Sequence, residues 1–148
     1  MTLDQWERNG WIIRHRTSPE EISNLLDIVA RDLMDVSHEE VSPDWRFGIA
    51  YNAALRLCTI LLHSSGYRAT GTGHHYHTIK ALSVLLGEER RSDAEYLDAC
   101  RKKRNISEYD YSGSTTDDDV AELVSFVETL KNDVIDWLKE NHPGLLRE

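Results

Sequence analysis

The residues best suited to chemistry in this chain lie between Arg101 and Tyr111. This run contains four consecutive cations, an asparagine and two tyrosines. On a helix, Arg101 and Arg104 are one turn apart, and Asn105 and Tyr109 continue the line of Arg101 at four-residue steps. Guanidinium groups hold phosphate through paired hydrogen bonds, and tyrosine rings stack on bases. The run therefore predicts a phosphate or nucleotide site, the alternative being a solvated basic turn near a helix end.

A polar stripe lies on the helix expected between Pro43 and Ser65. Arg56 is the only charged residue of this segment beyond Arg46. An unpaired buried charge is costly, so a buried Arg56 requires a carboxylate or a water-lined groove. Arg56 is therefore a candidate ligand-binding residue, the alternative being the exposed edge of a half-buried helix. The stripe comprises Asn52, Arg56, Thr59 and His63.

The run His74-His75-Tyr76-His77 opens another expected helix. His74 and His77 share a face at a spacing that can chelate a metal, but no cysteine or carboxylate pattern nearby completes a zinc site. Histidines at a helix start more often cap the helix or bind a carbonyl. The chain also lacks a Gly-rich phosphate loop and the GxSxG, CxxC and HExxH motifs. We expect no metal and no cofactor.

Composition restricts the partners. The formal charge of −9, from 26 acids and 17 bases, repels polyanions on average, so any RNA or nucleotide must bind a local basic patch, and we expect no DNA. No apolar run is long enough for a membrane span, and the N-terminus has no secretory pattern. Cys58 and Cys100 are expected to be reduced, packed thiols. These features predict a cytoplasmic protein without membrane contact.

The elements that must position these residues are helical, and no segment predicts a strand. Ser18-Pro19-Glu20-Glu21 predicts an N-cap, a proline at the first helical position and a glutamate at the third. Residues 110–115 are expected to form a flexible break. Helices are predicted over Leu3–Arg8, about Pro19–His38, Pro43 to about Ser65, His74–Leu86, from a capping box at Ser92 through the cations, and from Thr116 to just before Pro143.

Short connections between these helices favour antiparallel neighbours. The sequence therefore predicts a single domain over residues 1–148, with its core at about 18–141. The expected fold is all-α, an up-and-down helical bundle of four main helices plus one or two short ones. The segment from Pro43 to Ser65 is apolar around its circumference, so we expect it at the bundle centre or against a second subunit.

The order of several short motifs resembles the HEPN family (higher eukaryotes and prokaryotes nucleotide-binding), in particular its small stand-alone bacterial and archaeal members. The resemblance covers about Pro43 to Leu138. It rests on the order and spacing of the motifs, each of which is short. The motifs are, in chain order, Arg46, Tyr51-Asn52-Ala53 with Ala54, Gly66-Tyr67-Arg68, Gly73-His74-His75, Arg104-Asn105 and Tyr109-Asp110-Tyr111.

The resemblance implies a homodimer with its site in a groove at the pairing. Many members are RNA-cleaving toxins, often encoded with a minimal nucleotidyltransferase partner, and other, non-catalytic members bind nucleotides or protein partners. Catalytic members share an arginine, a polar residue after it and a histidine four to six residues further on. Arg104 matches the arginine and Asn105 matches the polar residue. The histidine is missing, and Tyr109 occupies the nearest equivalent position. Tyr111 matches a tyrosine that can carry adenylate groups in some members.

Loss of the motif histidine bears on activity. Metal-free RNA cleavage needs a group that moves a proton near neutral pH, and tyrosine, with a reference pKa of about 10, requires a large downward shift. We therefore expect a non-catalytic protein, part of a toxin–antitoxin type system, that binds a nucleotide, a phosphate ligand or a protein partner. The alternative is a ribonuclease using Arg104 and Asn105 with Tyr109, or with a histidine from another helix such as His74 or His75. The expected ligand-binding residues are Arg101, Arg104, Asn105, Tyr109, Tyr111 and Arg56.

Overall fold

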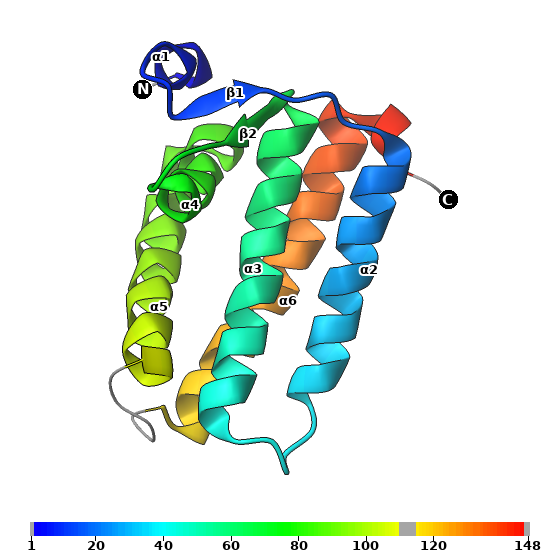
Figure 1. Ribbon diagram of the computed structural model, residues 1–148. Helices are drawn as coiled ribbons and strands as arrows, with labels where there is room; N and C mark the ends of the chain where they lie inside the picture. The colour runs from blue at the N-terminus through cyan, green and yellow to red at the C-terminus, as the bar shows by residue number, and fades with distance from the viewer. Residues whose placement is uncertain (1, 110–114, 147–148) are drawn as a thin grey trace.

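The computed structural model describes residues 2–109 and 115–146, apart from the side chains of residues 106–109. α2, α3, α5 and α6 run in alternating directions (Figure 1), which confirms the predicted all-α up-and-down bundle with additional short helices. Within the described ranges no helix has both the length and the apolar character of a membrane span. The elements are α1 (Leu3–Arg8), β1 (Ile12–Arg14), α2 (Pro19–Val36), α3 (Pro43–Ser64), β2 (Tyr67–Ala69), α4 (His74–Leu86), a 3-10 turn (Glu88–Arg90), α5 (Arg91–Tyr109), α6 (Asp117–Asn141) and a second 3-10 turn (Pro143–Leu145).

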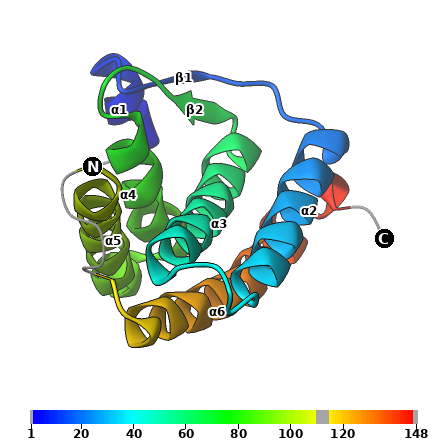
Figure 2. The ribbon, with the colours of Figure 1, turned by 60° about the horizontal axis from the view of Figure 1, so that its bottom comes forward.

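α3 occupies the centre of the bundle, where it contacts α2, α4, α5 and α6 (Figure 2). The Ser42 hydroxyl caps its first turn by accepting the backbone N–H of Trp45. Ala50, Ala53 and Ala54 are fully buried, and their small side chains let neighbouring helices approach closely. The predicted central position of this apolar helix is therefore confirmed.

The starts of the helices follow the predicted caps with one exception. Ser18 caps α2, and Thr116 forms a capping box with Asp119 at α6. The predicted N-cap at Ser92 is wrong, because Ser92 lies inside α5. Gly87, at φ 115°, ends α4 as expected. The 3-10 turn that follows Gly87 brings the chain into helical conformation before it reaches Ser92.

β1 and β2 form a two-stranded antiparallel sheet in which Ile12 pairs with Ala69. The expectation that the chain has no strand is therefore wrong. Each strand has three residues, too few for an alternating apolar pattern, and the pairing joins segments that are distant in sequence. The sheet lies across one end of the bundle together with α1 (Figure 1). Its small separate core consists of Trp6, Ile12, Leu62, Tyr67 and Ala81.

The two cysteines are free and buried, as predicted for packed thiols. Cys58 is fully buried on α3. Burial raises the pKa of Cys58 and raises that of Cys100 to about 11. Both groups are therefore protonated at neutral pH and are poor nucleophiles.

Candidate functional site

Arg101, Lys102 and Lys103 on α5 have carboxylate neighbours. Nε of Arg101 donates to Oδ1 of Asp98 at 2.9 Å, and Nζ of Lys102 lies 3.5 Å from Oδ2 of the same residue. Nζ of Lys103 lies 3.4 Å from Oδ2 of Asp119 on α6. Asp98 and Asp119 therefore offset part of the positive charge that the sequence concentrates here.

Arg104 lies against α3. Its guanidinium carbon is 5.3 Å from the centroid of the Tyr51 ring, within the range of a cation–π contact. Tyr51 is fully buried, and its hydroxyl has no hydrogen-bond partner among the described residues. Burial raises the pKa of Tyr51 to about 12, although Arg104 and Arg101 act in the opposite direction. Tyr51 is therefore a neutral phenol at physiological pH.

His75, in the first turn of α4, lies close enough to two arginines for their charges to act on it. Burial lowers the pKa of His75, and the charges of His74, Arg104 and Arg101 lower it further. α4 and α5 pack against each other, so they bring an imidazole into the field of two guanidinium groups within one chain. His75 is therefore neutral at pH 7 and able to accept a proton.

The other two histidines of the run have structural partners. Nδ1 of His74 bonds the carbonyl of Gly71 at 3.0 Å, as predicted for a histidine at a helix start. The ring of His77 stacks on Trp11 with the centroids 4.6 Å apart, and it meets Trp6 edge-on. Neither histidine belongs to a cluster of metal-ligating side chains in residues 2–109 and 115–146.

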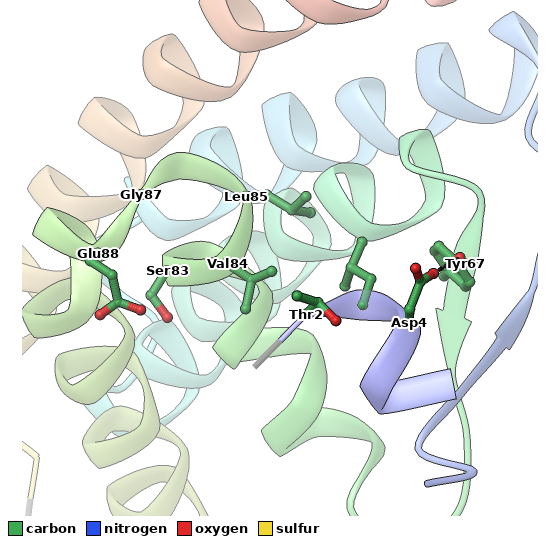
Figure 3. Close-up of a pocket in the computed structure, with 9 residues that line it drawn as sticks. Thr2, Asp4, Tyr67, Ser83, Val84, Leu85, Gly87 and Glu88 are labelled. Atoms are coloured by element: carbon green, nitrogen blue, oxygen red, sulfur yellow. Dashed lines mark hydrogen bonds between the residues drawn. The ribbon is translucent and has the colours of Figure 1, made fainter. Parts of the chain in front are cut away.

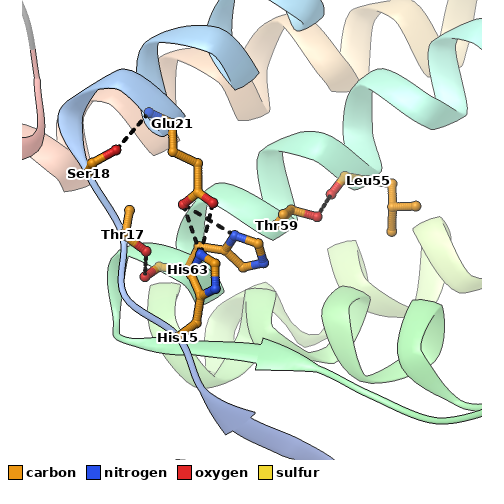
Figure 4. Close-up of polar contacts among 7 residues, drawn as sticks. All are labelled: His15, Thr17, Ser18, Glu21, Leu55, Thr59 and His63. Atoms are coloured by element: carbon orange, nitrogen blue, oxygen red, sulfur yellow. Dashed lines mark hydrogen bonds and ion pairs between the residues drawn. The ribbon is translucent and has the colours of Figure 1, made fainter.

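The polar stripe of α3 is half-buried along its length. Oγ1 of Thr59 donates to the carbonyl of Leu55 at 2.9 Å (Figure 4), so this hydroxyl is satisfied within the helix. Nε of Arg56 is buried and has no hydrogen-bond partner in the described part of the chain. A buried donor without an acceptor is unfavourable. Arg56 is therefore a half-buried cation with one donor that the described residues leave unsatisfied.

His63, at the other end of this stripe, joins His15 and Glu21 in a compact cluster (Figure 4). Nε2 of His15 lies 2.8 and 3.0 Å from the two carboxylate oxygens of Glu21. Nδ1 of His63 lies 3.5 Å from Oε2 of Glu21. One nitrogen or oxygen from each of the three side chains lies within 4.8 Å of the others. His15 was not singled out from the sequence, and Glu21 was expected only to cap α2.

Backbone contacts fix the three segments that carry this cluster. The N–H of His15 donates to the carbonyl of Gly66 at 2.9 Å, which extends the pairing of β1 and β2. The hydroxyl of Thr17 donates to the carbonyl of His63 (Figure 4). Sequence reasoning missed the cluster because the unpredicted sheet brings His15 to the end of α3.

The electrostatic environment keeps His63 neutral. Burial lowers the pKa of His63, and the neighbouring His15 lowers it further, whereas Glu21 acts in the opposite direction. The side chain of His63 is 18% exposed, so burial is the largest of these influences. At neutral pH this imidazole therefore has a lone pair available.

The remaining predicted site residues lie at or beyond the end of α5. Asn105 is exposed on that helix, and it belongs to the same face as Arg101. Tyr109 is the last residue of α5, and its side chain lies outside the described part of the structure. Tyr111 lies outside the described residues altogether. The structure therefore brings Arg101 and Arg104 together with Tyr51 and His75, and Arg56 lies further along α3.

An open groove of about 520 Å³ lies elsewhere, between α1 and the end of α4 (Figure 3). Its charged lining residues are Asp4 and Glu88, and the hydroxyl of Tyr67 donates to Oδ1 of Asp4 at 3.4 Å. An acidic lining disfavours phosphate. The groove is therefore separate from the cations of α5 in both position and chemistry.

Comparison of the chain with protein-family models, with curated proteins and with solved structures gives no significant match.

Proposed function

We propose that this chain is a HEPN-like protein that binds a phosphate-bearing ligand, a nucleotide or RNA, where α5 packs against α3 and α4. The observation that carries the proposal is the position of Arg104, which lies 5.3 Å from the Tyr51 ring of α3 on a helix that also packs against α4. The resemblance in sequence assigns Arg104 and Asn105 to the site of this family. The contacts of Arg104 and the sequence resemblance therefore support the same location for the site.

The chemistry of the arginines suits phosphate. Arg101 donates to Asp98 through Nε, and a guanidinium group has further N–H donors for phosphate oxygens. Arg104 covers the ring of Tyr51, so this tyrosine does not serve as a stacking platform for a base. The described residues therefore favour recognition of the phosphate over recognition of the base.

The proposal includes a homodimer that pairs through the outer face of α3. Trp45 on this helix is 69% exposed, and Nε of Arg56 has no acceptor among the described residues. A second copy would cover the indole and the partly exposed side chain of Arg56. Sedimentation at micromolar concentration tests this: we expect a dimer that Trp45→Ser weakens, whereas Tyr76→Ser, which alters an aromatic side chain 41% exposed on α4, does not. A monomeric native chain would contradict the pairing.

Binding can be measured with a labelled single-stranded RNA and a nucleotide panel in the presence of a chelator. We expect binding that weakens with salt and falls about tenfold or more in Arg104→Ala and Arg101→Ala. Arg31→Ala is the matched control, since Arg31 is an exposed cation that pairs with Asp32 on α2. Equal affinity in native protein and Arg104→Ala, or no binding at low salt, would refute the proposed site.

A metal-independent ribonuclease is the second candidate. The neutral imidazole of His75 could accept the proton of a ribose 2′-hydroxyl, while Arg101 and Arg104 stabilise the charge that develops on the phosphate. Cleavage of RNA in the presence of a chelator would establish this activity, provided that His75→Ala abolishes the cleavage and His142→Ala preserves it. Binding without cleavage would leave the non-catalytic function.

The resemblance alone suggests a nucleotidyltransferase partner in a toxin–antitoxin type system and adenylate groups on Tyr111. Co-purification from the native host followed by intact-mass measurement tests both. Expression that causes no growth arrest, with no such partner and no mass increase, would argue against this part of the proposal.

A further inference from the structure

We propose that His15, Glu21 and His63 form a mononuclear binding site for a divalent transition-metal ion. Two imidazoles and one carboxylate are a ligand set that suits zinc and its first-row neighbours, and three protein ligands leave a coordination position open for water. The site is independent of the proposed phosphate site. His63 lies fifteen residues along α3 from Gly48, which Arg104 overlies, and this corresponds to about 22 Å along the helix axis.

The spacing of the donor atoms fits one small ion. Bonds of about 2.0–2.2 Å at tetrahedral angles place neighbouring ligand atoms about 3.3–3.6 Å apart. The distance from Nε2 of His15 to Oε1 of Glu21 is 2.8 Å, and that from Nδ1 of His63 to Oε2 of Glu21 is 3.5 Å. Both separations from Glu21 are therefore close to the required value, and the ligand atoms of the two histidines lie within 4.8 Å of each other.

The carboxylate of Glu21 contacts the two histidines and does not complete the cap of its own helix. At α1 and α6 the third helical residue, Gln5 or Asp119, accepts the N–H of the capping residue through its side chain. At α2 the Ser18 hydroxyl accepts the N–H of Glu21, but the carboxylate of Glu21 does not accept the N–H of Ser18 in return. The carboxylate contacts the two histidines instead. Tertiary contacts therefore hold Glu21 in the geometry of a ligand.

His63 provides a second indication. Its Nδ1 is buried and has no hydrogen bond in the described structure, although it lies 3.5 Å from Glu21. A metal ion between these two atoms would give Nδ1 a partner. His15 would bind the ion through Nε2. A neutral ring must then carry its N–H on Nδ1, and an imidazolium ring must release the proton on Nε2 when the ion binds.

The positions of the ligands are set before any ion arrives. His15 follows β1, Glu21 lies in the first turn of α2, and His63 lies in the last turn of α3. The bond from His15 N–H to Gly66 and that from Thr17 to the His63 carbonyl hold the loop against α3. Such supporting contacts reduce the ordering that binding requires.

The probe is Zn²⁺, titrated into the tag-free, chelator-treated full chain against a chromophoric competitor. We expect one ion per chain, and at least a tenfold loss of affinity in each of His15→Ala, Glu21→Gln and His63→Ala. His38→Ala and His75→Ala are the matched controls and should retain the native affinity. Zn²⁺ should also raise the melting temperature of the native chain but not of the three site variants.

A measurement on the native chain keeps the test independent of the folding of the variants. On addition of Zn²⁺, imidazole ¹⁵N resonances of His15 and His63 should shift, while those of His38 and His142 remain in place. Shifts confined to His74, His75 or His77, affinity unchanged in the site variants, or no binding at submillimolar Zn²⁺ would each overturn the proposal. The cluster would then be a hydrogen-bonded connection between the loop and α3.

Discussion

Glu21 contacts Nε2 of His15 with both carboxylate oxygens, at 2.8 and 3.0 Å, across the turn that begins α2. This contact joins the first helix of the bundle to the segment that leaves the small sheet. The glutamate also approaches His63 on α3, so a single carboxylate connects three parts of the chain.

Removal of this carboxylate should lower the free energy of unfolding. We expect Glu21→Ala to cost about 1–2 kcal/mol in the absence of metal, because charged hydrogen bonds are stronger than neutral ones while partial exposure weakens them. Urea denaturation in a chelator measures the change. Asp27→Ala, at an exposed position of α2, should change the stability by less than about 0.5 kcal/mol. Equal effects of the two substitutions would show that the Glu21 contacts contribute little.

Tyr51→Phe should be neutral or stabilising by up to about 1 kcal/mol, because it removes a buried hydroxyl that has no partner among the described residues. The aromatic ring remains, so the contact with Arg104 is retained. A loss of more than about 1 kcal/mol in urea denaturation at pH 7 would indicate a hydrogen bond to Tyr51.

The same substitution should alter the stability at alkaline pH. Burial raises the pKa of Tyr51 from its ordinary value of 10.0 to about 12 in the folded chain. The folded state therefore holds this proton more tightly, and the contribution to stability is complete below pH 10 and lost as the pH rises towards 12. Tyr51→Phe should reduce the decline in stability between these values, whereas Tyr76→Phe should not.

The pKa of His75 depends on how close its ring lies to Arg101 and Arg104. It should lie below the ordinary value because of burial and the charges of His74, Arg104 and Arg101, and Arg104→Gln should raise it. Since the folded state resists protonation of His75, stability should decline as the pH falls below about 6.5. Titration by NMR tests the shift, with Arg31→Gln as the control. An unchanged pKa in Arg104→Gln would mean that α4 and α5 do not bring these residues together.

Gly48→Ala should stabilise the chain by about 0.5–1 kcal/mol, because alanine has a higher helix propensity than glycine inside a helix. The added Cβ would lie 3.9 Å from Nε of Arg104, an ordinary contact distance. Thermal and urea denaturation measure the gain. A destabilised variant with weakened ligand binding would show instead that Arg104 needs the space above Gly48.

Local patterns in the sequence determined most of the fold. Ser18 with Pro19 marked the start of α2, and the starts predicted at Pro43 and Thr116 agree with those of α3 and α6 within a residue. Signals of this kind act through contacts within one turn, so they can be read without knowledge of the tertiary structure. The apolar stretch of α3 likewise indicated its place at the centre.

Only some residues of the candidate sites could be predicted from such local patterns. Arg101 and Arg104 stand out because they are close in sequence, but their neighbours His75 and Tyr51 come from two other helices. His15 is brought to His63 by a sheet whose strands are too short to be recognised. Long-range pairing, which has no local pattern, accounts for the residues that were missed.

The pairing of Ile12 with Ala69 has a kinetic consequence. These residues are 57 positions apart, since 69 − 12 = 57. Closing a loop of this size costs about 3.6 kcal/mol of chain entropy beyond a constant. We expect the sheet to form after α2 and α3 have packed, and to open first in native-state hydrogen exchange. His15 would then leave His63 while the central helix remains folded, which makes this corner of the molecule the first to yield under stress.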